Sequence, residues 1–232
     1  MRKATLVVLA AILCAAAGYG GTASIVASFR SPCARVCGID YHGGYLYHGD
    51  GQNYIYRTTT TGSLLNSLNV GNASWGIDRT DDEFWTCNIA GFIFRLSKTG
   101  SVIRSFEGPS YPGYGITNGE GFLWYSTATY TYKMNITASL ISSFRLPASW
   151  HRGLCWDEPY LWTADNGTRR IFQITQTGSV VDSFSINENP YGVTWDGSYL
   201  WYSASNNWVY KTKLCYTAVE PASLGRVKAV YR

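Results

Sequence analysis

The sequence predicts an all-β fold, a five-bladed β-propeller of four-stranded blades, on three observations. A glycine followed by an aliphatic residue recurs at Gly38, Gly76, Gly115, Gly153 and Gly192, with spacings of 38, 39, 38 and 39 residues. Each copy contains short alternating runs rich in β-branched and aromatic residues, which indicate strands. No stretch after residue 17 has the pattern of a long amphipathic helix. Four short strands in a repeat of about 40 residues are the unit of a propeller blade.

The elements follow in the same order within each copy. The first strand begins at the glycine, and the second is an aromatic-Leu-Trp type segment, at residues 45–47, 83–85, 122–124, 160–162 and 199–201. A third alternating segment, a Thr-Gly-Ser type turn and a fourth run such as residues 179–184 complete the copy. Trp156 and Trp195, three residues after their glycines, are predicted to wedge between blades.

The two ends of the repeat region predict how the ring closes. The fifth copy lacks its fourth strand after about residue 214, whereas residues 22–29 match residues 137–144, turn residues included. We therefore predict that residues 24–29 form the outer strand of the last blade and pair beside residues 208–214. Closure of this kind protects both ends from becoming open sheet edges. A linear β-solenoid is the alternative, but it would have no reason to split one repeat between its two ends.

The N-terminal residues 1–17 have the pattern of a cleaved signal peptide. A basic start is followed by apolar residues 4–14 and three alanines at residues 15–17. About 11 apolar residues are too few to span a bilayer, which needs roughly 20, and no later stretch is longer, so we expect no membrane span. Lipidation at Cys14 is an alternative that Leu13 disfavours. We predict a propeller over residues 18–215, a C-terminal tail over 216–232, and a secreted, periplasmic or cell-surface location.

Composition excludes some classes of partner. The 232-residue chain has a formal net charge of +4, contributed by its two ends, so residues 18–215 are neutral on balance and nucleic acid is not an expected partner. The 9 Trp, 18 Tyr and 9 Phe suit packed sheets better than disorder. In an oxidising compartment, Cys33 and Cys37 are close enough in one loop to predict a disulfide, and Cys87 and Cys155 are predicted to be buried free thiols.

Three segments carry a resemblance to a known class of repeats. Residues 190–193 (Pro-Tyr-Gly-Val), residues 160–165 (Tyr-Leu-Trp-Thr-Ala-Asp) and the Ile-Phe of the third strand look like the NHL and YVTN repeats of bacterial propellers. The resemblance covers residues 22–215 and implies a scaffold that hosts many unrelated functions. Plant-type glutaminyl cyclotransferases are similar in size and secretion, although their active-site residues do not map onto this chain.

The loops before the five glycines are expected to ring one mouth of the central channel. The residues directly before the glycines are Cys37, Trp75, Tyr114, Arg152 and Tyr191, and His151 lies one step further out. Aromatic rings, an arginine and a histidine that converge could stack on a flat or sugar-like ligand and bond its polar rim. We therefore predict a ligand site of Trp75, Tyr114, His151, Arg152 and Tyr191. The alternative is that these aromatic residues only cap the ends of the blades.

Asp40 and Asp78, each two residues after a glycine, form a candidate acidic pair in neighbouring blades. Two carboxylates can divide the acid and base roles of glycoside cleavage. The alternative is that each caps a turn or bonds backbone amides. The sequence has no short His or Cys pair at zinc spacing, so we expect no metal, and nothing in it points to a cofactor.

The sequence favours an exported, monomeric, non-catalytic propeller that binds a small molecule, a glycan or a protein at one mouth of its channel. The alternative is a secreted enzyme similar to glutaminyl cyclotransferases, or a glycosidase or lyase that uses Asp40, Asp78 and His151. A structural surface module without a small ligand is a third interpretation.

Overall fold

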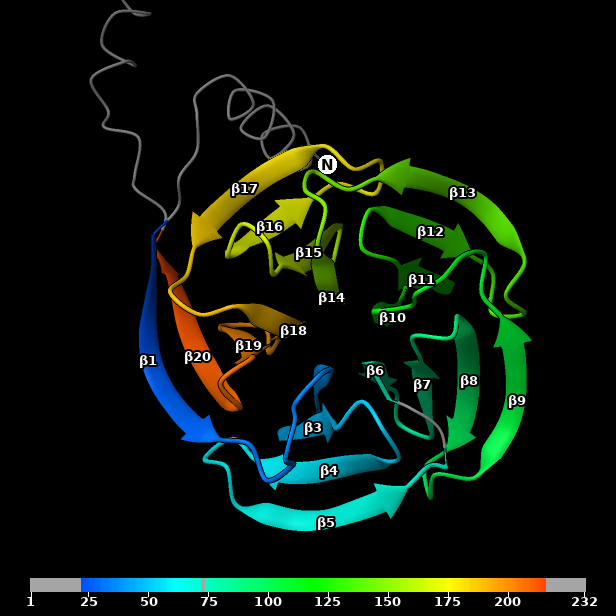
Figure 1. Cartoon of the computed structure of the whole chain (residues 1–232), viewed down its shortest axis with the longest axis horizontal. Coiled ribbons are helices and arrows are strands. Elements are labelled where there is room, and N and C mark those ends of the chain that lie inside the picture. The colour runs from blue at the N-terminus through cyan, green and yellow to red at the C-terminus, as the bar shows by residue number, and fades with distance from the viewer. Residues whose placement is uncertain (1–21, 72–73, 216–232) are drawn as a thin grey trace, which may run out of the picture.

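A computed structural model of the protein describes residues 22–71 and 74–215. These residues form five four-stranded antiparallel sheets arranged in a ring (Figure 1), which confirms the predicted all-β, five-bladed propeller. The described part of the chain contains no α-helix, and therefore none long and apolar enough to cross a membrane. The predicted signal peptide (1–17) and the predicted tail (216–232) lie outside the described residues.

Four blades use four consecutive strands each, and the fifth borrows the first strand of the chain. Blade 1 contains β2 (Ile39–His42), β3 (Tyr45–Gly49), β4 (Tyr54–Thr59) and β5 (Leu64–Asn69). Blade 2 contains β6 (Gly76–Arg79), β7 (Glu83–Cys87), β8 (Phe92–Ser97) and β9 (Val102–Glu107). Blade 3 contains β10 (Gly115–Gly119), β11 (Phe122–Ser126), β12 (Tyr130–Met134) and β13 (Leu140–Arg145). Blade 4 contains β14 (His151–Asp157), β15 (Tyr160–Asp165), β16 (Arg170–Ile174) and β17 (Val180–Ser185). Blade 5 contains β18 (Pro190–Trp195), β19 (Leu200–Ala204), β20 (Trp208–Cys215) and β1 (Thr22–Arg30).

The ring closes where β1 pairs with β20. The two strands are antiparallel from Thr22 opposite Cys215 to Arg30 opposite Trp208, with one irregularity between Ile25 and Ala27. Figure 1 shows β1 on the outer side of β20. The prediction that residues 24–29 complete the last blade is therefore confirmed.

Large aromatic side chains fill the space between blades. Trp156 of blade 4 stacks on Trp124 of blade 3, with ring centroids 5.9 Å apart, and Trp195 of blade 5 stacks on Trp162 of blade 4 at 6.5 Å. A Cβ at Gly119 would lie 2.1 Å from the Trp156 ring, so only glycine permits that approach. These contacts confirm Trp156 and Trp195 as wedges that join neighbouring blades.

The cysteines only partly follow the prediction. Cys87 and Cys155 are buried free thiols, as expected. Cys33 and Cys37 are free as well, so the structure does not contain the predicted Cys33–Cys37 disulfide. The Cys33 sulfur lies 2.9 Å from the Ser31 hydroxyl, whereas Cys37 packs against Trp75. Burial raises the pKa of Cys33 to about 11 and that of Cys37 to about 12, which keeps both thiols protonated. Closeness along the loop therefore did not bring the two sulfurs into a bond.

Candidate functional site

The five repeat glycines form a ring, which we call the glycine ring, where the inner strands meet at the axis. A Cβ at Gly153 would lie 2.6 Å from the Tyr191 carbonyl oxygen, and one at Gly192 would lie 2.6 Å from the Ile39 amide nitrogen. Neighbouring inner strands thus pack backbone against backbone, which no larger residue allows. This contact explains why the glycine recurs in every copy.

The channel is closed at the glycine ring. The cavity at this level has a volume of about 10 Å³, and its walls are the five glycines, Tyr114 and one aliphatic side chain from each blade, namely Ile39, Ile77, Ile116, Leu154 and Val193. Such a volume holds one water molecule at most. The glycine ring therefore divides the axis into two separate ends, one on each side of the inner strands.

The residues that directly precede the glycines meet at the first end. The guanidinium carbon of Arg152 lies 4.3 Å from the ring centroid of Tyr114 and 5.7 Å from those of Trp75 and Tyr191. We call these four residues, Trp75, Tyr114, Arg152 and Tyr191, the aromatic mouth. The fifth residue at this repeat position, Cys37, packs against Trp75 and Tyr114, so the structure brings together all five residues that directly precede the glycines.

Two further residues extend the aromatic mouth. The Arg152 guanidinium carbon also lies 5.7 Å from the ring of Trp150, which is 55% exposed, and the Arg35 guanidinium carbon lies 4.5 Å from the ring of Trp75. Sequence reasoning missed both. The signal was present, because Arg35 and Trp150 each stand three residues before a repeat glycine.

The aromatic mouth carries polar groups without protein partners. Within residues 22–71 and 74–215, the buried Nε of Arg152 and the buried Nε1 of Trp75 have no hydrogen-bond partner, and Arg152 forms no ion pair. Asp50 has a carboxylate near the aromatic mouth, where its charge acts on the Cys37 thiol. This carboxylate is not an ion-pair partner of Arg152, and its Oδ1 accepts hydrogen bonds from the amides of Gln52 and Tyr54. A half-buried cation without a counterion is costly unless a ligand or water satisfies it.

His151 does not belong to the aromatic mouth, which corrects the sequence prediction. Its ring is fully buried, with Nδ1 2.9 Å from the Thr163 hydroxyl and Nε2 accepting from the Ala148 amide at 3.2 Å. Burial lowers its pKa to about 4, against the opposing effect of Asp165, so the ring is neutral. The register of β14 against β15 shifts between His151 and Gly153, so Arg152 lies at an irregularity of the strand. The Arg152 side chain contacts rings of other blades, whereas the His151 ring contacts Thr163 and Phe172 of its own blade.

The second end of the axis is surrounded by the residues that stand two positions after the glycines, which we call the acidic belt: Asp40, Asp78, Thr117, Cys155 and Thr194. The Arg79 amide donates to Asp40 Oδ2 at 2.9 Å, and the Thr194 hydroxyl donates to Asp40 Oδ1 at 3.2 Å. The Asn118 side-chain amide donates to Asp78 Oδ2 at 2.8 Å, and the Thr117 hydroxyl donates to Asp78 Oδ1 at 2.9 Å. Each bond joins one blade to the next.

The two belt carboxyls lie close enough to influence each other. Burial and the neighbouring Asp78 charge raise the pKa of Asp40 from 3.8 to about 8, and burial raises the pKa of Asp78 as well. The predicted acidic pair is thus brought together in neighbouring blades. Its oxygens are engaged in bonds between blades, Asp40 with a backbone amide among them, which is the structural role that the sequence left open as an alternative.

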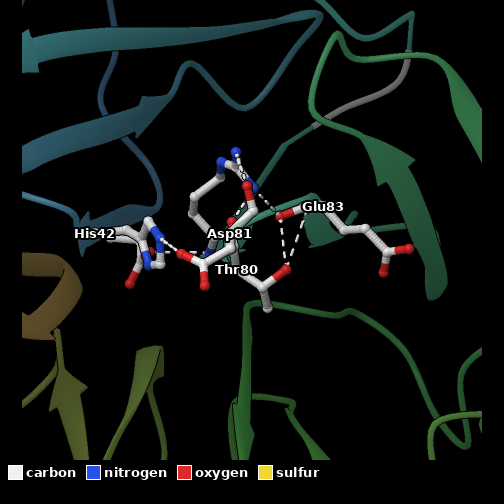
Figure 2. A network of polar contacts seen from close by, with 6 residues as sticks. His42, Thr80, Asp81 and Glu83 are labelled. Carbon is white, nitrogen blue, oxygen red and sulfur yellow. Dashed lines mark hydrogen bonds and ion pairs between the residues drawn. The ribbon is translucent and has the colours of Figure 1, made fainter.

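The exposed edge of the acidic belt carries a small polar network (Figure 2). His42 Nε2 lies 2.9 Å from Oδ1 of Asp81, which is 93% exposed. The Arg79 side chain donates to the carbonyl oxygens of Thr80, Asp81 and Glu83, which holds the turn between β6 and β7. His42 ends β2 of blade 1, and Asp81 lies in the turn between β6 and β7 of blade 2, so this contact joins two neighbouring blades. No group of three or more His, Cys, Asp or Glu residues in the described ranges is arranged to hold a metal.

Comparisons with known proteins identify the fold. No protein-family model matches the sequence. A search of well-characterised proteins also finds no match. Among solved structures, glutaminyl cyclase of Myxococcus xanthus is similar with a TM-score of 0.73 at 14% identity, covering 84% of this chain and 97% of that one.

Two further structures support the same assignment. Virginiamycin B lyase of Staphylococcus aureus gives a TM-score of 0.55 at 17% identity, covering 85% of this chain and 94% of that one. The WD40 propeller domain of Doa1 gives 0.56 at 14% identity, covering 77% of this chain and 63% of that one. At these identities the likeness concerns the fold alone. The chain is a five-bladed β-propeller that shares its architecture with bacterial propeller enzymes, in agreement with its NHL- and YVTN-like repeats.

Proposed function

We propose that this protein is an exported propeller that binds a small, flat, negatively charged molecule at the aromatic mouth. The observation that carries the proposal is the position of Arg152, whose guanidinium is surrounded by aromatic rings and has no ion-pair partner among the described residues. A guanidinium offers a planar fork that matches a carboxylate.

The rings supply the second part of the recognition. Tyr191 is half-buried and Trp150 is mostly exposed, so both offer surface on which a flat ligand can stack. Trp75 and Tyr114 are buried, and their ring centroids lie 5.7 and 4.3 Å from the Arg152 guanidinium carbon. Because the glycine ring closes the channel, the ligand enters from the mouth and does not pass through the axis.

Isothermal titration with matched pairs of flat molecules tests the proposal. Benzoate, 4-hydroxybenzoate and indole-3-acetate are each compared with the corresponding neutral amide. We expect at least one carboxylate to bind, its amide to bind about tenfold more weakly or not at all, and Arg152→Gln and Tyr191→Ala to abolish binding.

The control is Arg104→Gln, which removes one charge from an exposed arginine of β9 and should leave binding unchanged. Absence of binding by every carboxylate, or equal binding by the Arg152→Gln variant, would reject the proposal.

A second candidate function is catalysis by a secreted enzyme, with Asp40 as a general acid. It is favoured by the raised pKa of Asp40, about 8, which keeps this carboxyl protonated at neutral pH. The similar glutaminyl cyclase supplies the reaction to try first. Ammonia release from a peptide with an N-terminal glutamine, compared between the unmodified protein and Asp40→Asn, tests this candidate. Absence of release from the unmodified protein removes it.

A further inference from the structure

One position of the repeat carries a cation in four of the five blades. It is the fourth residue of the third-strand segment, occupied by Arg57, Arg95, Lys133, Gln173 and Lys211 in blades 1 to 5. In three of the four cationic copies the side chain both lies over an aromatic ring of its own blade and has a polar partner. Because this position is equivalent in all five blades, the polar partners of its side chain can be compared from blade to blade.

The polar partners differ in kind but are present in blades 2 to 5. Arg95 binds Glu83 through two hydrogen bonds of 2.6 and 2.7 Å. Lys133 donates to Gln176 at 3.0 Å, and Lys211 lies 3.8 Å from Asp196. Gln173 donates to Asp157 at 3.5 Å. The protein thus supplies an oxygen acceptor for this position in each of the other blades.

Arg57 is the exception. Its guanidinium carbon lies 3.7 Å from the Tyr45 ring centroid, yet its buried Nε has no hydrogen-bond partner within the described residues. The cause lies in the sequence: where blade 2 has Glu83 at the start of its second strand, blade 1 has Tyr45. The acceptor that satisfies Arg95 is therefore missing for Arg57.

Arg57 opens on a cavity between blades 1 and 2. The cavity has a volume of about 210 Å³, and Arg57, Arg79 and Lys98 contribute three positive charges to its wall, together with Asn66. No acidic residue lines it. Of the carboxylates on the turn before β7 and at its start, Asp81 binds His42 and Glu83 binds Arg95, whereas Asp82 is exposed and does not line the cavity.

We propose that this cavity, the Arg57 pocket, binds a small oxyanion of phosphate type, inorganic or as a monoester. The anion supplies the oxygen acceptor that blades 2 to 5 provide from the protein. Arg57 donates from its planar fork, Lys98 contributes a mobile positive charge from the exposed turn after β8, and Asn66 adds an amide donor. The Arg57 pocket lies between the blades and is separate from the aromatic mouth on the axis.

Titration with inorganic phosphate, followed by thermal unfolding and calorimetry at constant ionic strength, tests the proposal. We expect phosphate to stabilise the unmodified protein. Arg57→Gln should weaken phosphate binding by about tenfold or more, and Lys98→Gln by about threefold. Lys98 is exposed, so the second variant tests the pocket even where the first fails to fold. Glucose 6-phosphate and glucose, compared in parallel, separate binding of a monoester from binding of its neutral part.

Two control variants locate the effect. Arg104→Gln removes the same charge from the exposed face of β9 and should bind phosphate like the unmodified protein. Arg152→Gln removes the cation of the aromatic mouth and should also leave phosphate binding intact. The proposal is overturned if phosphate does not bind, if Arg57→Gln and Lys98→Gln bind it normally, or if Arg152→Gln is the variant that loses it.

Discussion

The two ends of the axis treat their charged groups in opposite ways. At the aromatic mouth, the guanidinium of Arg152 lies among rings, with a buried nitrogen that no described residue satisfies. At the acidic belt, the oxygens of Asp40 and Asp78 accept hydrogen bonds from a neighbouring blade. A buried polar group that is fully bonded contributes to the fold, whereas one left unbonded marks a place where something else is expected to bind. The difference separates the structural end from the candidate ligand end.

The largest expected loss of stability comes from a substitution in the glycine ring, which separates the two ends of the axis. Gly153→Ala places a Cβ 2.6 Å from the Tyr191 carbonyl oxygen and 2.8 Å from the Val193 amide nitrogen, both of them backbone atoms. We expect a loss of about 3 kcal/mol in the free energy of unfolding, measured by urea denaturation.

Gly44→Ala is the control for that change. Gly44 has a positive φ of 85° but open space where a Cβ would lie, so alanine there should cost only about 1 kcal/mol. Equal losses for the two variants would mean that the glycine ring is not held by backbone contact.

The next effect tests the structural end. Asp78→Ala leaves the Thr117 hydroxyl and the Asn118 side-chain amide without their acceptor, and we expect a loss of about 2 to 3 kcal/mol in stability. Carboxylate binding at the aromatic mouth should be unchanged. Asp81→Ala, at a 93% exposed side chain, should change stability by less than about 0.5 kcal/mol. Loss of ligand affinity in Asp78→Ala at a temperature well below its unfolding would contradict the separation of the two ends.

A smaller effect concerns the pH dependence of the acidic belt. The folded pKa of Asp40, about 8, lies above its ordinary value of 3.8, so the folded state holds this proton more tightly than the unfolded state. The resulting stability is fully present below about pH 4 and is lost progressively as pH rises to about 8. Asp40→Asn mimics the protonated form, and its unfolding free energy should therefore fall less between pH 5 and pH 8 than that of the unmodified protein. Parallel urea titrations at the two pH values measure this, and identical slopes would count against the raised pKa.

The smallest effect on stability is expected at the ligand end. Arg152→Gln removes a cation that has no ion pair among the described residues, so we expect a change of less than about 0.5 kcal/mol. The same change should abolish carboxylate binding, which gives the pattern opposite to that of Asp78→Ala. Strong destabilisation by Arg152→Gln, seen in thermal unfolding, would show that the cation–π contacts of the mouth are structural.

Much of the fold was predictable because one feature repeats. A residue that must be glycine in every blade fixes the register of the inner strands, and the register then places Trp75, Tyr114, Arg152 and Tyr191 at the same end of the axis. The missing fourth strand of the fifth copy predicted the pairing of β1 with β20 in the same way.

The errors concern side-chain direction, which a repeat position alone does not determine. His151 is a neighbour of Arg152 in sequence, but at the irregularity of β14 its ring bonds Thr163 of the same blade instead of joining the aromatic mouth. Cys33 and Cys37 share a loop, yet both thiols are free. The Arg57 pocket was also missed, because it becomes visible only when Arg57 and Arg95 are compared together with the acceptors around them.

The pairing of β1 with β20 has a consequence for how the gene for such a ring could be rearranged. Thr22 lies opposite Cys215, so the two ends of the described propeller are neighbours in space. Joining them by a short linker and opening the chain in an exposed turn, such as the one at Lys98 and Thr99, would move the closure from blade 5 to blade 2. Because all five blades have the same strand order, each can serve as the closing blade, and circular permutation of the ring should preserve its fold.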